Sequence, residues 1–117
     1  SNRHKIIEQI VEYIDKNLTS DLSLEALAGM AKFTPIYFHK LFKASTGNTL
    51  HRYVEEKRIK KSINLLLSTD MTLTEISYEC GFTSQSYFSY AFKRHMKISP
   101  REYAKKLLLD YGKNTNI

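Results

Sequence analysis

Apolar residues recur three and four positions apart along most of the chain, which is the spacing of amphipathic α-helices. Ile7, Ile10 and Ile14 form one such stripe near the N-terminus, and a longer stripe fills residues 49–68. We find no run in which apolar and polar residues alternate, the pattern typical of β-strands. The pattern therefore predicts an all-α protein of about seven helices.

Residues that begin and end helices stand at the edges of these stripes. The expected N-cap residues are Ser23, Thr34, Thr72 and Ser84. Thr72 is followed three positions later by Glu75, the spacing of a capping box. Gly47 and Gly81 are natural helix stops, and Pro100 starts the last helix. Residues 112–117 are expected to form a loose polar tail.

One segment of the chain occurs twice. FTPIYFHKLFKAS at residues 33–45 is echoed by FTSQSYFSYAFKRH at residues 82–95. Together with the short helix expected just before it, each copy gives a short helix, a turn and a second helix, the helix-turn-helix arrangement. We therefore expect an N-terminal helix-turn-helix unit at 1–48 and a C-terminal unit with the polar tail at 69–117. A long linker helix at 49–68 is expected to join the two units.

Positive charge is concentrated around the two copies. The chain of 117 residues has a formal net charge of +6. Residues 32–61 hold eight Lys and Arg against two Asp and Glu, and residues 85–117 hold seven against two. A basic surface attracts phosphate polyanions or acidic membranes, although an ordinary solvated face can have the same charge.

The second helix of each copy has a polar stripe opposite its apolar one. Lysine pairs with phosphate, amides and hydroxyls bind base edges, and apolar groups contact thymine methyls. One such face would be ordinary on a surface helix, but two faces within basic blocks favour DNA binding. With the two N-caps, the expected DNA-binding residues are Thr34, Ile36, His39, Lys40, Lys43, Ser84, Gln85, Ser86, Ser89, Tyr90 and Lys93.

A set of residues in the second half of the chain resembles a known family. They are Ile76, Gly81-Phe82, Ser86-Tyr87-Phe88, Phe92-Lys93, Ser99-Pro100 and Tyr103, supported by Tyr53, Arg58 and Leu65-Leu66. Residues 5–104 thereby resemble the DNA-binding domain of AraC/XylS-type bacterial transcription regulators. The resemblance implies sequence-specific binding to double-stranded promoter DNA by two recognition helices in adjacent major grooves. It also implies a cytoplasmic location, contact with RNA polymerase, and sensory domains outside this segment.

Two departures from the family pattern affect these expectations. Tyr90 stands where arginine is common, which leaves the preferred bases of the second half-site open. Lys97 replaces a common glycine, which leaves open the form of the turn before the last helix.

The sequence offers little for other functions. It contains no Gly-rich phosphate loop and no nucleophile–base pattern, so we expect no enzyme. The four histidines and single cysteine lack metal-ligand spacing, so we expect no metal and no cofactor. Cys80 is expected to be an inert core thiol, and the absence of a second cysteine fits a reducing compartment. No apolar run is long enough to span a membrane.

The sequence leaves one alternative open. A helical protein-interaction module that binds an acidic partner would have similar basic blocks. Salt-dependent DNA binding with a preference for one sequence would distinguish the DNA-binding domain from that module. We expect the isolated domain to be a monomer.

Overall fold

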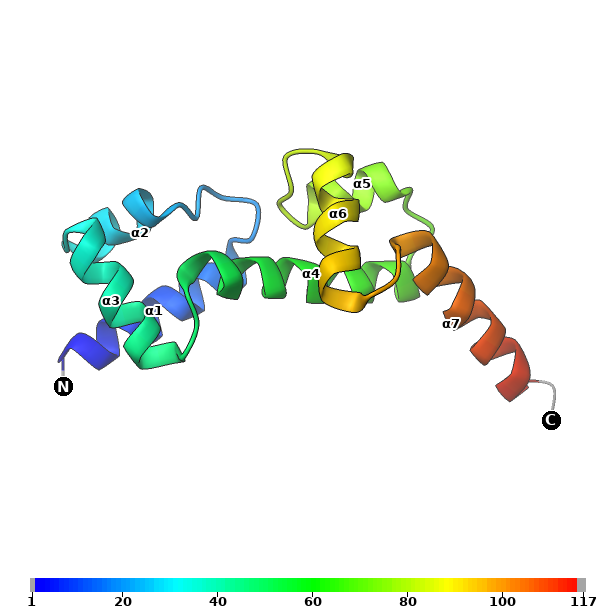
Figure 1. The fold of residues 1–117 in the computed structure, drawn as a ribbon, viewed down its shortest axis with the longest axis horizontal. Coiled ribbons are helices and arrows are strands. Elements are labelled where there is room, and N and C mark those ends of the chain that lie inside the picture. Colours follow the sequence, from blue (N-terminus) through cyan, green and yellow to red (C-terminus); the bar gives the residue numbers. More distant parts are fainter. Residues whose placement is uncertain (1, 116–117) are drawn as a thin grey trace. The chain divides into compact units, whose positions relative to one another are not determined.

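The computed structural model describes the backbone of residues 2–115 and the side chains of residues 2–110. Within these residues the secondary structure consists of helices without strands, which confirms the all-α prediction (Figure 1). The seven helices are α1 Asn2–Lys16, α2 Leu24–Ala31, α3 Pro35–Thr46, α4 Leu50–Ser68, α5 Leu73–Glu79, α6 Gln85–Met96 and α7 Pro100–Thr115.

The predicted N-caps are present because each side chain satisfies a backbone N–H that the first helical turn leaves without an intrahelical partner. Thr34 Oγ1 accepts a hydrogen bond from the Tyr37 N–H at 3.2 Å, and Ser84 Oγ accepts from the Tyr87 N–H at 3.1 Å. The capping box at the start of α5 is complete. Thr72 accepts from the Glu75 N–H at 3.1 Å, and the Glu75 carboxylate accepts from the Thr72 N–H at 3.0 Å.

The predicted polar tail is wrong for residues 112–115, because α7 continues through them to Thr115. Gly112 is tolerated because one glycine inside a helix costs only about 1 kcal/mol relative to alanine. Residues 116–117 of the expected tail lie outside the described residues.

Contacts divide the chain into two compact units, Ser1–Lys57 and Arg58–Ile117. The boundary falls inside α4, so the first half of this helix belongs to one unit and the second half to the other. The division into 1–48, 49–68 and 69–117 remains a prediction about which segments act as separate domains.

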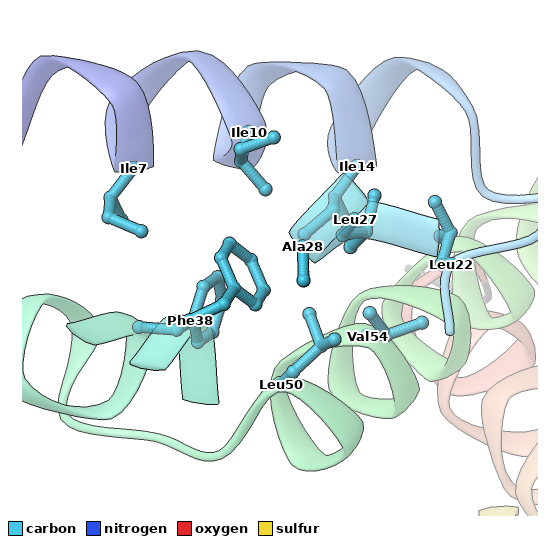
Figure 2. Close-up of a cluster of buried hydrophobic side chains, with 10 residues drawn as sticks. Ile7, Ile10, Ile14, Leu22, Leu27, Ala28, Phe38, Leu50 and Val54 are labelled. Carbon is cyan, nitrogen blue, oxygen red and sulfur yellow. The ribbon is translucent and has the colours of Figure 1, made fainter. Parts of the chain in front are cut away.

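The core of the first unit combines side chains from four helices. Figure 2 shows Ile7, Ile10 and Ile14 pointing from α1 into the core, with Phe38 of α3 below the first two and Leu27 and Ala28 of α2 beside Ile14. The core is completed by Leu22, Leu27, Ala28, Phe42, Leu50 and Val54. α3 is therefore held by its buried face, and its opposite face is left toward solvent.

The second unit repeats this packing with its own side chains. The buried residues are Ile59, Ile76, Cys80, Phe82, Phe88, Ala91 and Phe92. The rings of Phe38 and Phe42 are 5.8 Å apart, and so are those of Phe88 and Phe92. The sequence repeat therefore also repeats the spacing of these buried rings, although the rings meet at 41° in the first unit and at 70° in the second.

The turns also repeat, although glycine and lysine exchange places in them. Lys32 has φ 60° and its counterpart Gly81 has φ 98°, while Gly47 has φ 80° and its counterpart Lys97 has φ 73°. Gly47 and Lys97 each donate a backbone hydrogen bond of 2.8 Å to the carbonyl four residues earlier. Lys97 therefore preserves the turn that glycine makes in the first unit.

Candidate nucleic-acid interface

In the first unit, α3 presents the face that the sequence predicted. Its buried side carries Phe38 and Phe42. Pro35 is the first residue of the helix, where a backbone N–H would have no intrahelical partner, so the missing N–H of proline costs little. On the other side Ile36 is 73% exposed, an unusual position for a large apolar group. His39, Lys40 and Lys43 are exposed on the same face, as is the N-cap Thr34.

In the second unit, α6 presents the equivalent face. Phe88, Ala91 and Phe92 are buried. Ser86, Tyr90 and Lys93 are exposed, whereas Ser84, Gln85 and Ser89 are half-buried. Each helix thus places its predicted residues along one accessible side, although those of α6 are less accessible near its N-terminus.

Neither α3 nor α6 contains an aspartate or a glutamate. The last turn of α6 carries Lys93, Arg94 and His95. A helix surface without carboxylates does not repel phosphate, and its lysines attract it. The two helices therefore have charge that suits a polyanion.

Tyr90 is held in a small stack on α6. Its ring is 61% exposed and lies 6.1 Å from the ring of Tyr87. The Arg94 guanidinium lies 5.3 Å from the centre of the Tyr90 ring, within cation–π range. Arg94 was not among the predicted site residues, although its position four residues after Tyr90 places it on the same face.

A similar contact occurs beside α3. The Tyr37 ring packs edge-on against Phe33 at 5.0 Å, and the Arg3 guanidinium lies 5.9 Å from the centre of the Tyr37 ring. Arg3 comes from α1, so its proximity to α3 could not be read from sequence spacing. In each unit an arginine thus lies over a tyrosine of the helix that carries the predicted face, α3 or α6.

Gln85, the first residue of α6, makes a hydrogen bond to α5. The Thr74 hydroxyl donates to Gln85 Oε1 at 2.7 Å. The two residues are eleven positions apart and lie on different helices, so the sequence showed no signal for this contact. The amide of Gln85 is therefore oriented before any ligand arrives.

The described side chains offer no competing chemistry. Among them there is no cluster of His, Cys, Asp and Glu that could hold a metal ion. Cys80 is fully buried, and burial raises the pKa of its thiol to about 11, as expected for an inert core cysteine. As far as the chain is described, its helices are too short or too polar to cross a membrane.

Comparisons with known proteins agree with this geometry. A family model described as "Helix-turn-helix domain" matches residues 27–106. The HTH-type transcriptional activator RhaS of Enterobacter sp. strain 638 is 32% identical over 101 residues, which are 86% of this chain and 36% of that protein. The bifunctional transcriptional activator/DNA repair enzyme AdaA of Bacillus subtilis is 30% identical over 110 residues, 94% of this chain and 52% of AdaA.

Solved structures show the same fold. The C-terminal domain of AraT, a response regulator from Geobacillus stearothermophilus, aligns with a TM-score of 0.83 and 33% identity, covering 86% of this chain and 84% of that one. The DNA-binding domain of the transcriptional factor AdpA, crystallised with a target DNA, aligns with a TM-score of 0.82 at 24% identity, covering 86% and 90%.

These matches define the class as helix-turn-helix domains. The chain belongs to this family and is a DNA-binding domain of the AraC/XylS type. It spans about a third to a half of the length of the two curated relatives.

Proposed function

We propose that this domain binds double-stranded DNA with sequence preference through α3 and α6, which enter adjacent major grooves, and that it regulates bacterial transcription. The observation that carries the proposal is the repeated helix face, exposed in both units and free of carboxylates. A single α-helix fits the major groove, and membership of the AraC/XylS type supports this use of the fold.

The exposed residues divide into two roles. Ile36, His39 and Lys40 of α3 would contact base edges of one half-site, and the bases of the other half-site would be contacted by Gln85, Ser86, Ser89 and Tyr90 of α6. Lys43 and Lys93 lie one turn further along and would pair with phosphates. Thr34 and Ser84 lie at helix N-termini, where backbone N–H groups and the helix dipole favour a phosphate.

Further parts of the proposal rest on the family type. We infer that the isolated domain binds as a monomer, because one chain carries both recognition helices. Contact with RNA polymerase at promoters and a cytoplasmic location follow from a role in bacterial transcription. We also infer that the domain is not an enzyme, and the buried thiol of Cys80 supports this because a protonated, inaccessible thiol is a poor nucleophile.

Random-sequence selection with the purified domain tests the central proposal. We expect one asymmetric sequence to be enriched, with affinity that falls steeply as salt rises and exceeds that for random DNA by at least about a thousand-fold. Equal affinity for all sequences would reject it. Tight binding to acidic polypeptides in the absence of any DNA preference would favour the protein-interaction module instead.

A further inference from the structure

We infer that Thr74 controls which base Gln85 contacts, and that Gln85 selects guanine over adenine. The inference rests on the proposed function, because it assigns a specificity to the same face of α6. Thr74 is a positioning residue in this scheme, since it acts on the base through the Gln85 amide.

The starting observation is the 2.7 Å hydrogen bond from the Thr74 hydroxyl to Gln85 Oε1. This distance is typical of a good hydrogen bond. It places the carbonyl end of the amide against α5 and leaves Nε2 as the end that can reach outward. In this orientation Gln85 meets a ligand chiefly through its Nε2 donor.

Both ends of this contact are held by the fold. Thr74 is the second residue of α5, in the turn that the Thr72–Glu75 capping box closes. Gln85 is the first residue of α6 and follows the N-cap Ser84. Because both residues lie in capped first turns, the backbone that carries the hydroxyl and the amide belongs to helices rather than to flexible loops.

An amide held with its oxygen toward Thr74 distinguishes the two purines. Bidentate recognition of adenine requires glutamine to accept from N6 and donate to N7 at the same time. Guanine presents only acceptors, O6 and N7, on its major-groove edge. An amide oxygen can accept two hydrogen bonds, so the Thr74 bond acts through orientation: it holds Oε1 toward α5 and leaves Nε2 to donate to guanine O6 or N7. Bidentate recognition of adenine would require the amide to turn Oε1 toward N6 and give up the bond to Thr74.

The experiment uses the domain of residues 1–117 and the operator obtained by selection. Each base pair of the α6 half-site is replaced in turn by the other three, and Kd is measured for the parent domain, Gln85→Ala, Thr74→Val and Thr74→Ser. The position that loses its preference in Gln85→Ala marks the contacted base pair. There the parent should prefer guanine over adenine by about five- to 150-fold.

Thr74→Val keeps the branched shape but removes the hydroxyl, so Gln85 Oε1 becomes available to adenine N6. This variant should lose the guanine preference or reverse it toward adenine, while its affinity for random DNA stays within about two-fold of the parent. Thr74→Ser is the matched control because it restores a hydroxyl at the same position, and it should restore the guanine preference. A purely packing role for Thr74 would not produce this pattern.

Three results would overturn the inference. The first is a Thr74→Val domain with the same base preference as the parent, and the second is a parent that prefers adenine at the position marked by Gln85→Ala. The third is a Gln85→Ala domain that keeps every preference of a sequence-selective parent. A parent with no sequence preference at all would reject the proposed function, and this inference with it.

Discussion

Lys97 and Lys32 occupy a backbone region that lysine rarely adopts. Their φ values of 73° and 60° are positive, as are those of glycine at the equivalent positions of the other unit. The left-handed conformation costs a residue with a Cβ roughly 1–2 kcal/mol. The chain tolerates this cost because the turns require that conformation: the Lys97 N–H donates to the Lys93 carbonyl at 2.8 Å, and the Lys32 N–H donates to the Gly29 carbonyl at 3.1 Å.

Lys97→Gly should therefore stabilise the domain by about 1 kcal/mol, measured by urea unfolding. The side-chain bond from Lys97 Nζ to the Arg94 carbonyl is exposed and 3.4 Å long, so its loss costs little. Lys60→Gly is the control, since Lys60 is exposed within α4 and glycine there should destabilise by about 1 kcal/mol. A destabilised Lys97→Gly domain would contradict the strain argument.

Lys43 and Lys93 provide a second prediction at this scale. Both are exposed at equivalent positions, so each should neutralise one phosphate. Lys43→Ala and Lys93→Ala should weaken binding to specific and random DNA alike, and each should reduce the slope of log affinity against log salt by about one. Lys16→Ala, a change in α1, serves as the control. An unchanged slope in both interface variants would place these lysines away from the phosphates.

The accessible side of each helix could be read from the sequence because helical periodicity assigns each position to a face. The partners of the predicted residues could not. Thr74 reaches Gln85 from another helix, and Arg3 reaches Tyr37 from α1. Such contacts depend on how helices pack, which spacing within one helix does not reveal.

Among the elements, the capped helices were the most predictable. A cap is a local interaction, so Thr34, Ser84 and the Thr72–Glu75 pair predicted the starts of α3, α6 and α5. The sequence predicted that α7 would end before Gly112, but the helix continues to Thr115. Whether a helix ends at a glycine depends on whether a non-helical conformation of the following residues is more stable than the helix. Glycine alone is a weak signal of that balance.

The position of α6 depends on its buried rings. Phe88 is fully buried and packs on Phe82 at 5.2 Å and on Phe92 at 5.8 Å. Phe88→Ala should cost about 3–5 kcal/mol and unfold the second unit at a markedly lower temperature. Circular dichroism on heating would measure this.

Tyr78→Ala is the matched control for that measurement. Tyr78 is an exposed aromatic residue on α5, so its truncation should change stability by less than about 0.5 kcal/mol. Similar melting curves for the Phe88→Ala and parent domains would mean that the buried face of α6 is assigned wrongly.

For the whole molecule, the proposal predicts the layout of the operator. α4 has 19 residues, a length of about 28 Å at 1.5 Å per residue, close to the roughly 34 Å of one DNA turn. We expect an asymmetric site with half-sites about ten base pairs apart, because the reading residues of α3 and α6 differ. Inserting about five base pairs between the halves should reduce affinity to that of one half-site, since it rotates one half to the far side of the duplex.

A gel-shift titration with no insertion, about five and about ten inserted base pairs would measure this. The isolated half-sites serve as controls for the expected loss. Undiminished affinity after the five-pair insertion would mean that the units adjust independently or that only one of them contacts bases.

The boundary between the compact units falls within α4, and this has a consequence for how the chain unfolds. Helix formation is cooperative, because each residue's hydrogen bond depends on neighbours that are already helical. Around Lys57 and Arg58 those neighbours belong to different units. Denaturation that begins in the core of one unit should therefore also unfold the adjoining turns of α4 in the other unit. Repeat proteins behave in this way, because adjacent repeats stabilise each other through their shared interface. Amide hydrogens near this boundary would then exchange at the rate set by the weaker unit.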